Sequence, residues 1–196
     1  MAGNNGSQIR VAGSGRILVA KAGATGPAAP AHTGDAWADG WTELGYTTTD
    51  GIKFNKKDKI DPVDTWQSVS PARFIYSDRD LTVKFQLLQL NKDTLSFFMG
   101  GDTVTSVTGT GVSDTYQYKL ASEPKQDERQ LGIEFKDGAD VTYRFIIPRG
   151  QVTETEEIAL TRTGSLKLGV TFTALAAENS PILATWIMKD KAFGAA

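Results

Sequence analysis

The sequence predicts a mainly β protein, built as an antiparallel β-sandwich or barrel with one short flanking α-helix. Three observations support this fold class. Several segments alternate apolar and polar side chains with a period of two, which gives a strand one buried and one wet face. The connections between these segments are short, and strands do not alternate with helices as they do in parallel α/β folds. Residues 91–99 alone carry both the pattern and the caps of a helix.

The N-terminal quarter contains one expected strand between two irregular segments. Residues 1–15 are rich in Gly, Ala, Asn and Ser, so they are expected to form a flexible N-terminal arm. The strand is predicted at residues 16–20, where Ile, Leu and Val follow one another. Residues 23–36 are rich in Gly, Ala and Pro, which is typical of an irregular loop. A short strand is expected at residues 41–46, before a turn at residues 47–51 that holds an Asp-Gly pair.

Residues 47–64 form a charged segment with few apolar side chains to anchor it to a core. Two interpretations stay open. The segment could be a solvated hairpin, or it could be an extended loop that docks on a neighbouring subunit. Its mixture of Lys and Asp side chains suits electrostatic docking. Long strands favour docking as well, because a free sheet edge is normally short, covered or paired with another chain.

The clearest strand and the one expected helix follow this segment. The strand is predicted at residues 81–87, where every second side chain is apolar. The helix is predicted at residues 91–99, because Asn91 is a favoured N-cap residue and Gly100 a favoured C-cap residue. Its buried face is expected to carry Leu95, Phe98 and Met99.

The second half adds five alternating segments, at residues 116–120, 131–135, 141–147, 165–177 and 182–188. An Asp-Gly pair joins the second and third of these segments, which predicts a hairpin. The fourth segment would span roughly 43 Å at about 3.3 Å per residue, longer than a usual strand. These patterns predict a single β-sandwich domain over residues 16–190, followed by a C-terminal tail of residues 191–196.

Composition excludes several classes of function. The chain has 196 residues, no Cys and a single His, so disulfides, thiolate catalysis and Cys-ligated or multi-His metal sites are excluded. A formal net charge of −2 provides no basic field for nucleic acid or anionic lipid. The sequence lacks the pattern of a signal peptide and any apolar stretch of about 18 residues. We therefore expect a cytosolic, non-membrane and non-enzymatic protein that needs no cofactor or metal.

Few residues form patterns that carry chemistry. Glu154, Glu156 and Glu157 could take part in acid/base or metal chemistry, but a solvated or partner-facing strand face is the favoured interpretation. His32 lies in a Pro- and Gly-rich loop and is expected to be solvated, without a carboxylate partner. Two tryptophans could form a platform on which sugars stack, although such residues more often anchor a loop to the fold. They are Trp37 and Trp41.

One ordered set of segments resembles a known protein family. It begins with Trp-Thr-Glu-Leu-Gly-Tyr-Thr-Thr-Thr-Asp-Gly-Ile at residues 41–52 and continues through the charged segment to the strand at residues 81–90. Leu-Ser-Phe-Phe-Met-Gly-Gly at residues 95–101 and Ile-Ile-Pro at residues 146–148 follow. Over residues 16–190 this order is similar to that of the major tail tube protein of long-tailed, non-contractile bacteriophages.

The resemblance implies a β-sandwich with one flanking helix that closes into homohexameric rings. The rings would stack into a hollow tail tube, which conducts genomic DNA without binding it specifically. The inter-ring stacking loop would be residues 47–64, with contacts at Asp50, Gly51, Lys56, Lys57, Asp58, Lys59, Asp61 and Asp64. The arm would contribute contacts at Ile9, Arg10 and Val11. The candidate lumen-facing residues are Glu154, Glu156 and Glu157.

The implied partners are further copies of the chain, the tape measure protein, and the tail terminator and distal tail proteins. The implied location is the virion tail, and the host cytoplasm during assembly. Two other classes stay open. A stand-alone β-sandwich binding module, for carbohydrate or for virion decoration, would use Trp37 and Trp41 as contacts. A type VI secretion-like tube protein would have the same fold, but residues 41–51 favour the phage tail.

Overall fold

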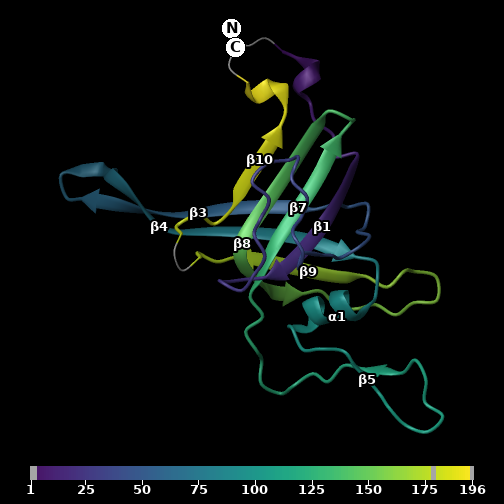
Figure 1. The fold of residues 1–196 in the computed structure, drawn as a ribbon. Coiled ribbons are helices and arrows are strands. Elements are labelled where there is room, and N and C mark those ends of the chain that lie inside the picture. Colours follow the sequence, from purple (N-terminus) through teal and green to yellow (C-terminus); the bar gives the residue numbers. More distant parts are fainter. Residues whose placement is uncertain (1–3, 178–179, 195–196) are drawn as a thin grey trace.

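The computed structural model describes residues 4–177 and 180–194, which form a mainly β architecture with one α-helix (Figure 1). The predicted fold class is therefore confirmed. The helical elements are η1 (Gly6–Gln8), α1 (Lys92–Met99) and η2 (Lys191–Phe193). The strands are β1 (Ser14–Lys21), β2 (Thr42–Glu43), β3 (Lys53–Thr65), β4 (Ser68–Leu87), β5 (Thr105–Ser106), β6 (Tyr116–Gln117), β7 (Arg129–Asp137), β8 (Val141–Thr155), β9 (Leu168–Ala174) and β10 (Thr185–Lys189).

One eight-stranded antiparallel sheet contains every strand except β5 and β6, which pair with each other. Its order is β2-β1-β7-β8-β9-β4-β3, with β10 also paired to β8. The first part of β8 pairs with β7 and β10, whereas residues 150–155 pair with β9. Strand β8 thus belongs to two halves of the sheet. One half contains β2, β1, β7 and β10, and the other contains β9, β4 and β3. In Figure 1 the strands β1, β7, β8 and β10 run steeply, and β3, β4 and β9 cross them.

The core lies between these two halves and draws apolar side chains from both. Ile17, Leu131 and Ile147 come from one half and Val83 and Val170 from the other, and all belong to one buried cluster. They are the inward members of the alternating runs, so the period of two directs one side of each strand into the core. The packing of the two halves against one another makes the molecule a sandwich.

Helix α1 closes one end of this core. Its caps are as predicted: Asn91 and Thr94 form a capping box, and Gly100 adopts the left-handed conformation at φ 98°. The predicted buried face is confirmed for Phe98, whereas Leu95 and Met99 are only partly buried, and Thr94 and Phe97 are buried instead. Phe97 stacks between Phe85 and Phe172, with ring centroids 6.2 and 6.1 Å apart. These contacts explain why Phe97 faces the core.

Several predicted strands are shorter in the structure. The segment at residues 165–177 forms a strand only over Leu168–Ala174, because Leu168 pairs with Leu87, the last residue of β4. Alternation of side chains continues past the point where the partner strand ends, and alternation alone does not make a strand. Likewise, residues 41–46 contribute only β2, and residues 116–120 contribute only β6. The hairpin predicted around the Asp-Gly pair is confirmed as β7 and β8.

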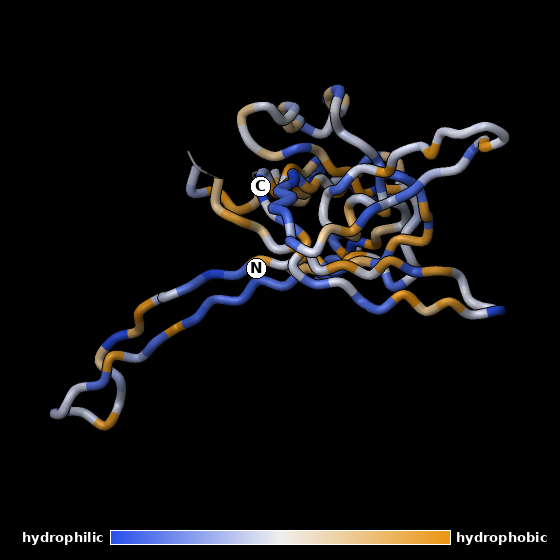
Figure 2. Tube along the Cα trace, turned by 90° about the horizontal axis from the view of Figure 1, so that it is seen from below, coloured by the Kyte–Doolittle hydropathy of each residue, from blue (hydrophilic) through white to orange (hydrophobic). Residues whose placement is uncertain are grey.

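Strands β3 and β4 form a long hairpin that leaves the sandwich. The strand predicted at residues 81–87 is the inner end of a 20-residue strand, and the charged segment up to residue 64 lies mostly in its 13-residue partner. Figure 2 shows the hairpin reaching far from the rest of the molecule, with hydrophobic positions between hydrophilic ones. The segment therefore forms a hairpin, and its docking on a neighbouring subunit stays a prediction.

The two predicted terminal segments are described only in part. Residues 1–3 of the arm and residues 195–196 of the tail lie outside the described residues. Within the range assigned to the arm, η1 forms at Gly6–Gln8 and β1 already begins at Ser14.

Candidate assembly surfaces

The projecting hairpin has two different faces, which its strand register defines. Directly opposed residues of antiparallel strands point to the same side. Phe54 and its partner Val83 point toward the core, where Phe54 meets the ring of Phe145 edge-on with 4.7 Å between centroids. We call the side that continues outward from this pair the inner face. Beyond the pair it carries Lys56 with Leu81, Asp58 with Arg79, Ile60 with Tyr76, and Pro62 with Phe74.

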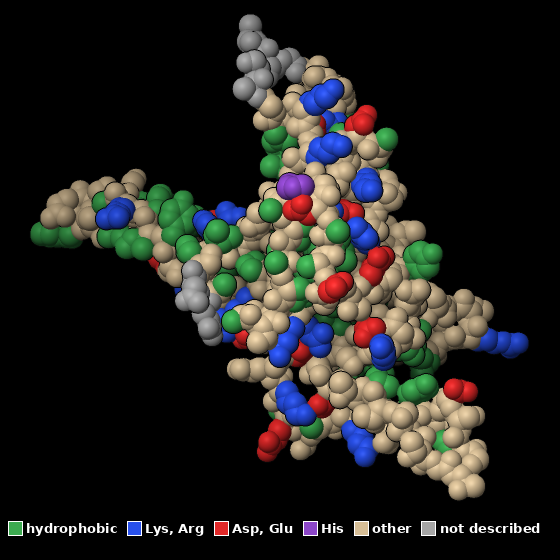
Figure 3. Space-filling model, in the orientation of Figure 1, with side chains coloured by type: hydrophobic (Ala, Val, Ile, Leu, Met, Phe, Trp, Pro, Cys, Tyr) green, Lys and Arg blue, Asp and Glu red, His purple; other side chains and the backbone are tan. Residues whose placement is uncertain are grey.

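The outer part of the inner face is apolar and uncovered. Ile60, Phe74 and Tyr76 are 46%, 59% and 68% exposed. The hairpin ends in a turn at Trp66 and Gln67, and the side chain of Trp66 is 97% exposed. Figure 3 shows hydrophobic side chains gathered along this arm. An isolated hairpin of two strands is marginally stable, and contiguous exposed apolar residues mark an interaction surface.

An ion triad interrupts the inner face near its base. The Asp58 carboxylate is 2.6 Å from the Lys56 ammonium nitrogen and 2.7 Å from Nε of Arg79. The hydrogen bond from Arg79, and then that from Lys56, lowers the pKa of Asp58 to about 2. Two cations share one carboxylate, so the triad carries an excess of positive charge.

The residues predicted for the stacking loop do not form one site. Asp50 and Gly51 lie in a turn beside the sandwich, where Gly51 has a φ of 69° and its N–H donates to the Thr48 carbonyl at 3.0 Å. The inner face carries Lys56 and Asp58. The opposite face and the outer end of β3 carry Lys57, Lys59, Asp61 and Asp64. Sequence patterns missed the apolar inner face, because a bulge beside Ile60 places Phe74 and Tyr76 on the same side as Ile60.

The outer edge of the hairpin offers backbone groups for pairing. Strand β3 is the last strand in the sheet order, so among the described residues its outer edge has no partner strand over 13 residues. A free edge of this length is a template for a strand of another chain. The free edge of β3 and the apolar inner face both belong to the β3–β4 hairpin.

The side of the β8–β9–β4–β3 half that faces away from the core is polar. Thr82, Thr171 and Thr173 alternate with core residues of β4 and β9, and Oγ1 of Thr173 lies 2.8 Å from Oγ1 of Thr153. We call this side the hydroxyl face. Lys84 of β4 lies on the same side, and acidic residues border it at the end of β8. The hydroxyl face therefore combines hydroxyl groups with charges of both signs.

The three predicted lumen residues are all exposed, and two of them reach the hydroxyl face. Glu154 lies 3.8 Å from the ammonium nitrogen of Lys84. Glu156 accepts a hydrogen bond of 2.6 Å from the Gln86 side chain. Glu157 is exposed beyond the end of β8.

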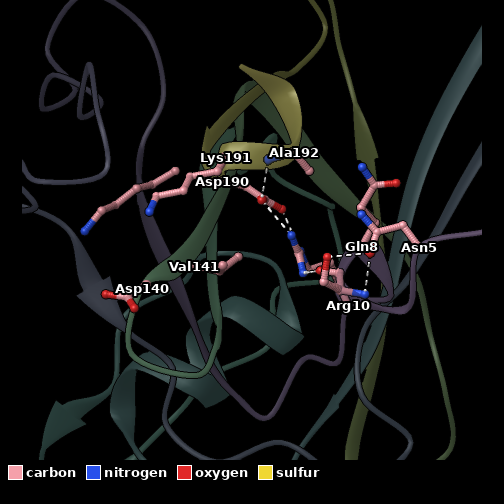
Figure 4. Close-up of a pocket in the computed structure, with 10 residues that line it drawn as sticks. Asn5, Gln8, Arg10, Asp140, Val141, Asp190, Lys191 and Ala192 are labelled. Atoms are coloured by element: carbon pink, nitrogen blue, oxygen red, sulfur yellow. Dashed lines mark hydrogen bonds and ion pairs between the residues drawn. The ribbon is translucent and has the colours of Figure 1, made fainter. Parts of the chain in front are cut away.

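The N-terminal segment is attached to the C-terminal end by a cluster around Arg10 (Figure 4). Nε and Nη2 of Arg10 each lie 2.6 Å from a carboxylate oxygen of Asp190, which also accepts from the Tyr143 hydroxyl. The N–H of Ala192 donates to the same carboxylate at 2.9 Å. The hydrogen bond from Arg10 is the main reason that the pKa of Asp190 lies well below its usual range. The neighbouring arm residues Ile9 and Val11 are exposed.

The two tryptophans of the early loop cover the outer side of the β1–β7–β8 half. Their rings meet at 4.8 Å, and the guanidinium of Arg144 lies 5.2 Å from the Trp37 ring. Trp41 donates from its indole N–H to the Ala28 carbonyl at 3.1 Å. These rings anchor the loop and do not form an open stacking platform. His32 is exposed as expected, but it does have a carboxylate partner, Asp35, at 2.7 Å.

Residues 4–177 and 180–194 contain neither a metal-binding cluster nor a membrane-spanning helix. No three His, Cys, Asp or Glu side chains converge where they could hold a metal ion. No helix in this part of the chain has the length and apolar character needed to cross a membrane.

Comparison with known proteins identifies one family. A family model described as phage tail tube protein matches residues 1–196, which is the full chain. No curated protein matches the chain significantly.

Proposed function

Because the chain belongs to the family of phage tail tube proteins, which are structural proteins and not enzymes, we propose that its copies close into hexameric rings. The rings stack into the hollow tube through which genomic DNA leaves the virion. The membership itself implies a structural role in the virion tail and assembly with other tail proteins. The ring, the stack and the passage of DNA are the proposal.

The observation that carries the proposal is the projecting β3–β4 hairpin. It holds an unpaired edge of 13 residues and an uncovered apolar face, and neither has a partner within the described subunit. A contact between two different surfaces of identical subunits closes into a ring when the rotation allows, and a further contact propagates the stack. The hairpin reaches far enough to supply such a contact between subunits.

The hydroxyl face is proposed to line the lumen. On this face Lys84 is exposed and Thr82 and Thr173 are partly exposed, whereas the loop of Trp37 and Trp41 covers the outer side of the other half of the sheet. Its charges are mixed, since Lys84 lies beside Glu154. A surface without a continuous row of cations gains little from releasing the counterions of DNA, so DNA can slide past it. The formal net charge of −2 also limits repulsion between stacked subunits.

The further partners are those of a tail tube. The tape measure protein occupies the lumen before DNA does, and tail terminator and distal tail proteins cap the two ends of the tube. Assembly takes place in the host cytoplasm, and the finished tube is part of the virion. The terminal segments held by the Arg10–Asp190 cluster are proposed to add contacts between rings.

Truncation of the hairpin tests the proposal. Lys57 and Asp80 are directly opposed in the register, so an Asn-Gly turn can join them and replace residues 58–79. The truncated subunit is expected to fold, as judged by circular dichroism, and to stay monomeric. Negative-stain electron microscopy over a concentration series should show rings or uniform hollow filaments for the wild type alone. Tubes formed by the truncated subunit would contradict the role of the hairpin.

A further inference from the structure

An apolar groove lies at the base of the hairpin. It lies between the inner face and β10, has a volume of about 480 Å³, and is bordered by Phe54, Leu81, Ile182 and Trp186. Ile182 and Trp186 are 52% and 44% exposed. The volume falls in the range of roughly 300–1,000 Å³ that is usual for pockets that bind small organic groups. An aromatic side chain would therefore fit in it.

The hairpin tip carries side chains that suit this groove. Trp66 stands at the turn and is 97% exposed, and Val69 beside it is fully exposed at 106%. A tight turn does not require an indole at its corner, and Trp is among the residues that most often anchor an interface. Because the Trp66 side chain is almost fully exposed in its own subunit, it is available to fill a recess on another molecule.

The charges of the two surfaces are complementary. Lys56 and Arg79 border the groove and share the single carboxylate of Asp58, which leaves one positive charge in excess. The outer part of the hairpin, residues 60–76, holds Asp61 and Asp64 against Arg73, which leaves one negative charge in excess. Complementary charges fix the register of an interface and speed its formation more than they add affinity.

The hairpin cannot deliver its tip to its own groove. About ten residues separate Lys56 at the groove from Trp66 at the tip, which corresponds to roughly 33 Å of extended strand. Figures 1 and 2 show the arm directed away from the sandwich, and Figure 1 shows that it also points away from β10. We infer that the tip of one copy docks in the groove of a second copy, with Trp66 in the groove and the acidic outer hairpin beside the ion triad. This inference rests on the proposed self-assembly and names the surfaces that carry it.

Cross-linking tests the contact directly, because the natural chain contains no Cys. Gln67→Cys places a thiol at the tip and Ile182→Cys places one in the groove. A chain with both substitutions, treated during assembly with a short thiol–thiol cross-linker, should give a ladder of multimers. An equal mixture of the two single variants should stop at dimers. The matched control pairs Gln67→Cys with Lys84→Cys, which lies on the opposite side of β4 from the groove and should give no product.

A second variant measures how much the anchor contributes. Trp66→Ala should raise the protein concentration needed for assembly by about tenfold or more, as expected for an anchor residue. Tyr46→Ala removes a similarly exposed aromatic residue, 74% exposed, far from the tip and should change this concentration little.

The outcomes separate the inference from the proposed function. If the wild type forms tubes while the Gln67–Ile182 ladder is absent and Trp66→Ala assembles normally, the docking site is wrong and the tube function stands. If the wild type forms neither rings nor tubes at any concentration, self-assembly fails and the docking site fails with it. A ladder from the Lys84 control would place the tip on the other side of the sheet.

Discussion

At the scale of single residues, a buried ion pair connects the early loop to the sheet. Nε of Arg144 lies 2.6 Å from Glu134, and its terminal nitrogens donate to the His32 and Asp35 carbonyls at 2.9 Å each. Burial by itself raises the pKa of Glu134, but the hydrogen bond from Arg144 and the charges of Arg16 and Arg144 outweigh burial and lower it. The arginine therefore satisfies a buried carboxylate and holds the loop backbone in place.

Removal of this arginine should destabilise the subunit strongly. Arg144→Ala leaves Glu134 buried without its main partner, and the expected loss is about 3 kcal/mol of the free energy of unfolding. Urea unfolding measures this loss. Arg16→Ala is the matched control, because Arg16 contacts the same carboxylate at 3.0 Å from a side chain that is 39% exposed. It should cost less than about 1 kcal/mol, and equal losses for both variants would contradict a dominant role of Arg144.

Asp58 should make the hairpin base sensitive to acid. Its pKa in the folded subunit is about 2, below its ordinary value of 3.8 in an unfolded chain. The ion triad therefore stabilises the folded state above pH 4, and this contribution disappears as the pH falls through 2. A ¹³C NMR titration of the Asp58 carboxyl should give a midpoint near 2, while Asp58→Asn should remove the titration step. A midpoint near 4 would mean that Lys56 and Arg79 do not hold the carboxylate in solution.

At the scale of elements, the early loop depends on the absence of a side chain in β7. A Cβ atom added at Gly132 would lie 2.4 Å from a ring carbon of Trp37 and 3.1 Å from one of Trp41. The two indoles thus occupy the space above this glycine. The loop packs closely on β7 because Gly132 has no side chain.

A side chain at position 132 should displace the loop while the sandwich stays folded. Gly132→Ala is expected to cost about 1–3 kcal/mol of stability through overpacking. Exposure of the indoles should shift intrinsic fluorescence to the red. Gly13→Ala serves as the control, because a Cβ there would meet only a backbone oxygen of Lys136 at 3.8 Å. Unchanged fluorescence in Gly132→Ala would show that the indoles do not pack on β7.

At the scale of the whole molecule, central strands of the sandwich are paired along both edges, whereas the outer strand of the hairpin is paired along one edge only. Strands β7 and β8 are each paired along both edges over much of their length, whereas β3 pairs only with β4. The subunit therefore combines a stable body with an arm whose backbone and apolar groups await a partner. Regions with few buried contacts open more readily than a core does.

Hydrogen exchange should report this difference. Amides in residues 57–80 are expected to exchange quickly in the monomer and at least tenfold more slowly in assembled tubes, because assembly covers the edge and the inner face. Strands β7 and β8 provide the internal control and should be protected in both states. Rapid exchange of the hairpin in assembled tubes would contradict its burial between subunits. Mass spectrometry of peptic fragments gives the required resolution.

Local sequence signals predicted those parts of the fold that depend on neighbouring residues along the chain. The caps Asn91 and Gly100 located helix α1, and the Asp-Gly pair located the β7–β8 hairpin. The candidate stacking residues were only partly informative. Charge identified the segment, but the surfaces available for contact are apolar residues of the inner face, and these depend on a bulge in the register with β4.

The sequence by itself determined the class of the protein. Alternation of side chains, helix caps and turn pairs are local properties, and they sufficed for a mainly β fold with one helix and for the resemblance to tail tube proteins. Tertiary structure alone decided where each strand ends, which residues share a face and which residues far apart in sequence meet. Arg10 and Asp190 form their pair across almost the whole chain, and Phe54 reaches Trp186 with 5.4 Å between centroids. Such contacts depend on strand register and on the crossing of two sheet halves, which a period of two along the chain does not encode.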